Sequence, residues 1–190
     1  MDSSQKLTNT DVKKLNKNRI FRLIYNSDKI SRQEIADRLG LSLPTVNQNL
    51  KMLMEDGLIE YVGNFTSTGG RRAQAITISN NARKAISVNI KADYINVDVV
   101  GLKGQIIYSM YVKAHFNKSS AYIEKLTDAV RHAADYVGAD ADDILGVGIT
   151  VPGILDDEKQ ILISAPPLKA KNYDFTKLIS AIDYPVVVMN

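Results

Sequence analysis

The 190-residue chain is 45% hydrophobic and 24% charged, which is enough for one sizeable domain or two smaller ones. It has no cysteine, so disulfides and thiolate metal sites are excluded, and His115 and His132 lie too far apart in sequence for a zinc cluster. Because no apolar run approaches the ~18 residues of a membrane helix and the N-terminus lacks the apolar region of a signal peptide, we expect a soluble, cytoplasmic protein.

Positive charge is concentrated in the first part of the chain. Residues 1–80 hold 12 Lys and Arg against 8 Asp and Glu, a net charge of +4, whereas residues 81–190 hold 12 against 13, a net charge of −1. A basic surplus favours contact with the phosphates of a nucleic acid, although +4 is also common in ordinary domains.

Residues 7–16 are polar, with Val12 and Leu15 at helical spacing. A first helix is predicted from Ile20, Phe21, Leu23 and Ile24, and it can pack under the two short amphipathic helices that follow. The second helix begins after Ser31, whose hydroxyl makes a good N-cap, and Glu34 stands where a capping box needs it. Gly40 supplies the left-handed conformation that ends a helix, and Ser42 can cap the third. The spacing predicts a helix-turn-helix pair with a short, fixed turn.

The third helix has two contrasting faces. Val46, Leu50 and Leu53 repeat at helical spacing and form a predicted buried stripe. The opposite side is polar and free of acids, which suits a helix in the major groove, where amides and hydroxyls hydrogen-bond base edges and Lys meets phosphates. The candidate DNA-binding residues at this helix are Ser42, Pro44, Thr45, Asn47, Gln48 and Lys51.

A hairpin follows the helices. Residues 58–62 and 75–78 predict two paired strands, and between them two glycines precede Arg71 and Arg72. Such a tip can approach a phosphate backbone closely and place guanidinium groups along a minor groove. We therefore predict a winged helix-turn-helix DNA-binding domain over residues 7–79. Two alternatives remain open: a winged helix that binds protein, and arginines that only make a loop more soluble.

The remainder, residues 82–190, predicts an α/β domain. Its expected elements follow the order βββαβαβ, with strands at residues 86–90, 94–100, 105–112, 144–149 and 185–189 and helices at 119–137 and 175–182. The acids at 156–158 and 140–143 are interpreted as solvated turns or loops, and Gly146, Gly148 and Gly153 as structural glycines.

In this order and spacing the motifs resemble the ROK family of repressors and sugar kinases, and within it the xylose-repressor-like and N-acetylglucosamine-repressor-like regulators. The residues that carry the resemblance are Asn18-Arg19, Ser31-Arg32-Gln33-Glu34-Ile35-Ala36, Gly40-Leu41-Ser42-Leu43-Pro44-Thr45-Val46, Gly57-Leu58-Ile59, Gly69-Gly70-Arg71 and Gly146-Val147-Gly148-Ile149-Thr150-Val151-Pro152-Gly153. The resemblance implies that the second part is the first lobe of a ribonuclease-H-like or actin-like ATPase fold.

Two departures from the family's kinases bear on activity. The kinases carry Asp-x-Gly-Gly-Thr-Lys after their first strand, where glycines let the backbone cradle phosphates, and this chain has residues 89–94 as Asn-Ile-Lys-Ala-Asp-Tyr. The chain also ends at Asn190, which matches a family asparagine that contacts sugar hydroxyls, before the catalytic Asp, the zinc motif and the second lobe. A family Ala-Pro-Asn-Leu stretch is Ala-Pro-Pro-Leu at residues 165–168. We therefore expect that the chain has no enzyme activity, no cofactor and no metal. We also expect that it is a fragment of a longer regulator or a truncated product.

The leading hypothesis is therefore a sequence-specific transcriptional regulator that represses carbohydrate-utilisation genes. Its expected partners are a double-stranded DNA operator, a sugar or sugar-phosphate effector for the full-length form with Asn190 as a sugar ligand, and a second copy in a homodimer. The competing hypothesis is a fragment of an ATP-dependent sugar kinase, which the missing glycine loop disfavours.

Overall fold

The computed structural model describes residues 8–65, 73–80, 82–138, 143–156 and 158–190. The chain divides into two compact units, Met1–Ala82 and Arg83–Asn190. Among the described residues, no helix is both long enough and apolar enough to cross a membrane.

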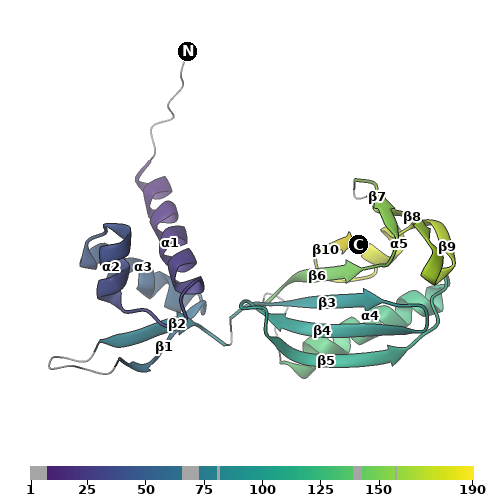
Figure 1. Cartoon of the computed structure of the whole chain (residues 1–190), viewed down its shortest axis with the longest axis horizontal. Coiled ribbons are helices and arrows are strands. Elements are labelled where there is room, and N and C mark those ends of the chain that lie inside the picture. Colours follow the sequence, from purple (N-terminus) through teal and green to yellow (C-terminus); the bar gives the residue numbers. More distant parts are fainter. Residues whose placement is uncertain (1–7, 66–72, 81, 139–142, 157) are drawn as a thin grey trace, which may run out of the picture. The chain divides into compact units, whose positions relative to one another are not determined.

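The first unit is a three-helix domain with a β-hairpin (Figure 1). Its elements are α1 (Asn9–Tyr25), α2 (Arg32–Leu39), α3 (Leu43–Glu55), β1 (Ile59–Asn64) and β2 (Gln74–Ile78). The predicted helix-turn-helix and the strands of the hairpin are thus present. A further pairing was not predicted: Ile30, between α1 and α2, forms an isolated antiparallel bridge with Ile76 of β2, which adds a third backbone segment beside the hairpin.

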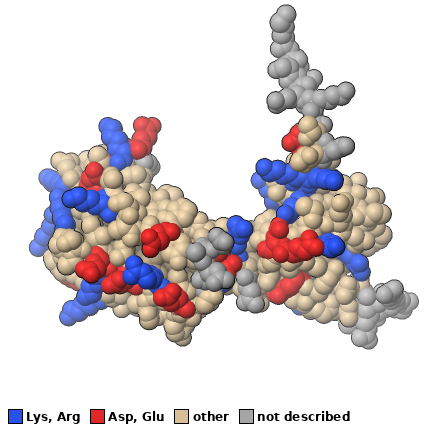
Figure 2. All heavy atoms as spheres, turned by 180° about the vertical axis from the view of Figure 1, so that it is seen from behind, with Lys and Arg blue, Asp and Glu red and all other residues tan. Residues whose placement is uncertain are grey.

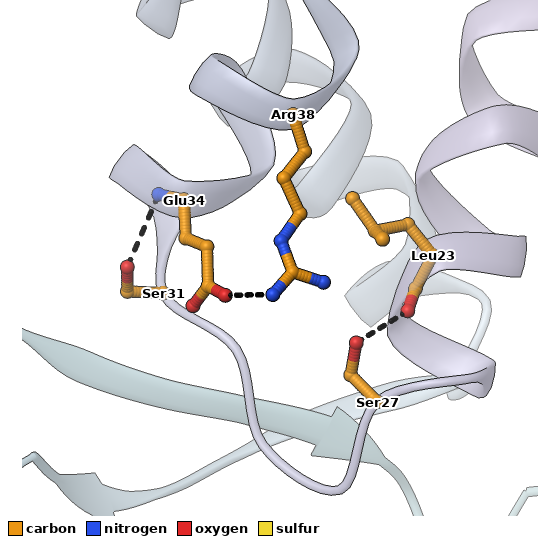
Figure 3. Close-up of polar contacts among 5 residues, drawn as sticks. All are labelled: Leu23, Ser27, Ser31, Glu34 and Arg38. Atoms are coloured by element: carbon orange, nitrogen blue, oxygen red, sulfur yellow. Dashed lines mark hydrogen bonds and ion pairs between the residues drawn. The ribbon is translucent and has the colours of Figure 1, made fainter.

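Local caps fix the ends of these helices. Ser31 accepts a hydrogen bond from the backbone N–H of Glu34 (3.2 Å), and Gly40 ends α2 at φ 64°, both as predicted. The predicted capping box is only half formed, because the Glu34 carboxylate pairs with Arg38 (2.6 Å) on the next turn (Figure 3). The hydroxyl of Ser27 donates to the carbonyl oxygen of Leu23 at the end of α1 (2.7 Å), as the same view shows.

The core of the first unit lies where the three helices meet. Val46, Leu50 and Leu53 of α3 are at most 1% exposed, so the predicted stripe is confirmed. They share this core with fully buried isoleucines of α1 and α2, namely Ile20, Ile24 and Ile35. Burying such a stripe is what stabilises helices too short to persist alone in water.

The second unit is a five-stranded mixed sheet with one long helix against it (Figure 1). The strands β3 (Lys84–Ile90), β4 (Tyr94–Gly101), β5 (Ile106–Lys113), β6 (Ile144–Thr150) and β10 (Val186–Met189) are ordered β10-β6-β3-β4-β5. The predicted meander is confirmed, because β3, β4 and β5 pair antiparallel. Strands β6 and β10 join it in parallel, each after a crossover connection. Helix α4 (Ser120–Tyr136) packs on β3, β4 and β5.

The predicted element order, βββαβαβ, lacks a second sheet that the structure contains. Strands β7 (Ile154–Asp156), β8 (Ile161–Ala165) and β9 (Ala170–Asp174) form a three-stranded antiparallel sheet, with a short 3₁₀ helix, η2 (Pro166–Leu168), before β9. The helix expected at 175–182 is only α5 (Thr176–Ile179). The prediction missed β9 because its sequence, AKNYD, lacks an apolar alternation, and its pairing with β8 decides its conformation.

Charge is mixed on one face of the second unit. On the face seen at the left of Figure 2, Lys and Arg side chains are interspersed with Asp and Glu. This agrees with the near-neutral balance of that part of the chain. The view gives no sign of a basic field of the kind that a nucleic acid requires on this face.

Candidate nucleic-acid interface

Helix α3 turns a polar face to solvent, opposite its buried stripe. Of the predicted contact residues, Pro44, Asn47, Gln48 and Lys51 are exposed, and Thr45 is partly buried. The polar side is therefore not packed into the interior. An exposed row of amides and an ammonium group on a helix matches what the major groove of DNA offers as partners.

Ser42 and Thr45 hold the beginning of this helix. The Ser42 hydroxyl accepts a hydrogen bond from the backbone N–H of Thr45 (3.4 Å), and the two hydroxyl oxygens lie 2.9 Å apart. Pro44 occupies the first turn, where a missing N–H leaves no intrahelical bond unmade. The predicted cap is confirmed, and it fixes the position of the first residues of the polar face.

We expect Ser42→Ala to lower the free energy of unfolding by about 1 kcal/mol, because the orphan amides of α3 lose their side-chain acceptor. Urea denaturation followed by circular dichroism measures the change. Ser42→Asp restores an acceptor at a favourable place in the helix dipole and should recover the stability. A variant Ser42→Ala as stable as the parent would contradict the role of this cap.

Asn49 is a residue of α3 whose position the sequence analysis missed. It is 4% exposed and its side-chain nitrogen donates to the carbonyl oxygen of Thr45 (2.8 Å). A signal was available: Val46, Asn49, Leu50 and Leu53 follow the i, i+3, i+4, i+7 spacing of a buried face. Asn49 thus belongs to the inner side of the helix, whereas Asn47 and Gln48 are exposed.

Lys51 has one acidic neighbour. Its ammonium lies 3.7 Å from the carboxylate of Glu55 one turn later, and the two side chains are 78% and 62% exposed. Pairs this exposed contribute little, so Lys51 can exchange Glu55 for a phosphate at small cost.

The structure describes the two strands of the hairpin, whereas the tip between them lies outside the described residues. Strands β1 and β2 pair from Ile59↔Ile78 to Asn64↔Gln74, and the amide of Phe65 donates to the carbonyl oxygen of Ala73 (2.9 Å). Arg71 and Arg72, the predicted wing contacts, lie outside the described residues.

Arg32 is a polar residue of this surface that the sequence analysis did not single out. Its guanidinium lies 3.5 Å from Oδ1 of Asn47 on α3 and 3.4 Å from Oε1 of Gln74 on β2. These two contacts bring the start of α2, the polar face of α3 and the hairpin together. No local pattern predicts them, because Gln74 is 42 residues away in sequence.

In the second unit, Asn190 lies beside the turn that follows β6. Its side-chain nitrogen donates to the carbonyl oxygen of Gly153 (2.9 Å), at the carboxyl ends of the parallel strands β6 and β10. Ligands of α/β folds commonly bind at such strand ends. Across the sheet, residues 91–93 form a tight turn after β3, closed by the amide of Lys91 donating to the carbonyl oxygen of Tyr94 (3.0 Å).

The two histidines are surface residues. His115 is exposed and lies 2.8 Å from Asp93, and His132 is exposed on α4. Within the described part of the chain, no group of three or more His, Cys, Asp or Glu side chains is placed to hold a metal ion.

Comparison with known proteins identifies the two parts. Residues 15–60 match a family described as winged helix-turn-helix DNA-binding, and residues 85–190 match the ROK family. The chain is 29% identical over 157 residues to the xylose repressor of Bacillus subtilis (strain 168), an alignment that covers 82% of this chain and 40% of the repressor. It is 24% identical over 168 residues to the DNA-binding transcriptional dual regulator NagC of Escherichia coli (strain K12), covering 88% of this chain and 41% of NagC.

The fold has a solved counterpart. A crystal structure described as a ROK family transcriptional regulator, homolog of the E. coli MLC protein, superposes with a TM-score of 0.63 at 20% identity, covering 94% of this chain and 46% of that one. This superposition confirms the fold class predicted from the sequence, and the family models and relatives confirm the resemblance. The chain spans about half the length of the curated relatives that it matches, 40% of the B. subtilis repressor. Since the family model covers residues 85–190, more than half of the sequence, the chain belongs to the ROK family, with a winged helix-turn-helix ahead of one ROK lobe.

Proposed function

We propose that this chain is a sequence-specific DNA-binding transcriptional regulator that represses carbohydrate-utilisation genes. The exposed polar face of α3, set opposite a stripe that is at most 1% exposed, is the observation that carries the proposal. The relatives named xylose repressor and N-acetylglucosamine repressor support the regulatory role. The proposed contact residues are Ser42, Pro44, Thr45, Asn47, Gln48, Lys51, Arg71 and Arg72.

The proposal assigns different tasks to the two parts. Residues 7–79 bind a double-stranded operator in the cytoplasm, and residues 82–190 are a partial ROK domain that serves sugar sensing and dimerisation. Asn190 is the proposed sugar ligand, since its side-chain oxygen is left to accept from a hydroxyl while its nitrogen donates to Gly153.

The test begins with selection of duplexes that bind the chain from a random library. On the selected duplex, Gln48→Ala should alter sequence preference, because a lost base contact costs about 1–3 kcal/mol at one position only. Arg71→Ala should weaken binding to every duplex alike and flatten the dependence of log K on log salt by about one unit, because one phosphate contact is lost. Fluorescence anisotropy at several salt concentrations measures both.

Lys103→Ala is a matched control, because Lys103 is exposed in the turn between β4 and β5 of the other unit. It should bind like the parent. Equal loss on all sequences from Gln48→Ala would contradict its base-reading role, and failure of the parent chain to retain any duplex at low salt would contradict the proposal as a whole.

We also propose that the chain is not an enzyme. In this chain, the turn after β3 has Lys91 and Ala92 at the place where the family's kinases carry a glycine pair. The Cβ atoms of Lys91 and Ala92 would therefore obstruct the approach of a phosphate to the backbone. A coupled assay with glucose, xylose or N-acetylglucosamine should show no sugar-dependent ATP turnover. Turnover above the rate without sugar would establish the kinase alternative.

A further inference from the structure

A pocket opens beside the recognition helix of the first unit. It has a volume of about 240 Å³ and lies between the start of α2, the start of α3 and strand β2. Its lining residues are Arg32, Gln33, Leu43, Asn47, Ala73 and Gln74. Asn47 belongs both to this lining and to the polar face of α3, so the pocket and the proposed base-reading surface are continuous.

The Arg32 guanidinium lies beside two amide oxygens. It lies 3.5 Å from Oδ1 of Asn47 and 3.4 Å from Oε1 of Gln74. Because a guanidinium only donates hydrogen bonds, both amides must turn their oxygen atoms toward it. Two of its five N–H groups meet these oxygens, which leaves the others for a further acceptor.

The chemistry of the lining favours an anion. Its side chains contribute one fixed positive charge and three amides, and no carboxylate is among the described residues that line it. Of the two acids of α2, Asp37 accepts a hydrogen bond from the Gln33 amide (2.9 Å) and Glu34 pairs with Arg38 (2.6 Å). The planar fork of a guanidinium fits two phosphate oxygens.

We propose that this pocket seats one backbone phosphate of the bound DNA, with the Arg32 guanidinium as its main donor. The inference rests on the proposed function, because a duplex whose base edges meet Asn47 must pass its sugar-phosphate backbone next to the pocket. Arg32 would thereby fix the register of the duplex on α3, and the Asn47 amide, whose oxygen faces Arg32, presents its NH₂ group to acceptors on the bases.

The decisive experiment neutralises phosphates one at a time. Duplexes selected by the parent chain are synthesised with a single methylphosphonate at each position, and binding is measured for the parent and for Arg32→Gln. We expect one phosphate whose neutralisation weakens the parent roughly tenfold, the size of a charge-assisted hydrogen bond, and leaves Arg32→Gln unaffected. Arg32→Gln should also flatten the salt slope by about one unit on every sequence.

Two variants distinguish a phosphate site in this pocket from the general effect of removing a positive charge. Arg38→Gln removes an equal charge from the same helix. The Arg38 side chain pairs with Glu34 and points toward the end of α1 (Figure 3), so this variant should retain the parent's response to every methylphosphonate. Arg32→Lys keeps the charge without the fork and should restore the salt slope but only part of the affinity. Circular dichroism verifies that each variant is folded.

Other outcomes would contradict the proposed phosphate site. If Arg32→Gln keeps the affinity and the salt slope of the parent, or if it responds to every methylphosphonate as the parent does, the pocket does not hold a phosphate, and the proposed function stands. A change in sequence preference without a change in salt slope would show that Arg32 contacts a base, and it would contradict the phosphate site. Absence of any DNA binding by the parent would refute the proposed function itself.

Discussion

Leu50→Ala is expected to destabilise the first unit by about 2–5 kcal/mol, because the deletion leaves a cavity among three helices. Leu50 is 1% exposed in the middle of the α3 stripe, and α3 packs on both α1 and α2. A domain of this size has a stability of only about 5–15 kcal/mol, so the loss is a large fraction of the total. DNA binding should weaken in parallel, since the polar face of α3 depends on the helix being docked.

Met52→Ala is the control on the same helix. Met52 is 37% exposed, so its truncation leaves no enclosed cavity and should cost little. Hydrogen exchange resolved by residue follows both variants, and faster exchange in Leu50→Ala should be confined to α1, α2, α3 and the hairpin. Similar protection of these elements in Leu50→Ala and Met52→Ala would show that the stripe does not hold the unit together.

Gly153→Ala is expected to destabilise the second unit by about 3 kcal/mol, through the left-handed backbone conformation and overpacking together. Gly153 has φ 128°, and an added Cβ would lie 2.3 Å from the carbonyl oxygen of Ser164 and 2.9 Å from Cα of Ala165. Both neighbours are backbone atoms of β8 and cannot turn away as a side chain can. The substitution should also displace Asn190, whose side chain donates to the Gly153 carbonyl.

Gly148→Ala provides the matched comparison within the preceding strand. The nearest atom to an added Cβ at Gly148 is Cε of Met189 at 3.8 Å, an ordinary contact with the end of a flexible side chain. We expect its free energy of unfolding to stay within about 1 kcal/mol of the parent, as in tolerated substitutions. Denaturant unfolding of the two variants tests the pair, and equal stabilities would show that the close approach of β8 does not constrain residue 153.

The features that sequence analysis located well are those whose causes are local. Ser31, Gly40 and Ser42 cap or end helices through their own backbone and side-chain geometry, and the structure has all three in those roles. The same holds for the stripe of α3 and for the meander β3-β4-β5, where spacing along the chain decides which face is buried.

The features that were missed depend on distant partners. One exception is local: Glu34 has the signal for a capping box, yet its carboxylate pairs with Arg38 on the next turn of the same helix. The bridge between Ile30 and Ile76 and the strand β9 exist because another segment offers free backbone groups beside them. Such pairings are not encoded in the pattern of either segment alone.

By itself, the sequence determined the helix-turn-helix, the buried stripe and the polar residues of α3, because helix periodicity and caps act within a few residues. Only the tertiary structure decided that Arg32 meets Asn47 and Gln74 beside one pocket and that Gly153 is closed in by β8. Those arrangements follow from the packing of separate elements, where van der Waals contact and hydrogen-bond geometry select among positions that the local pattern leaves open.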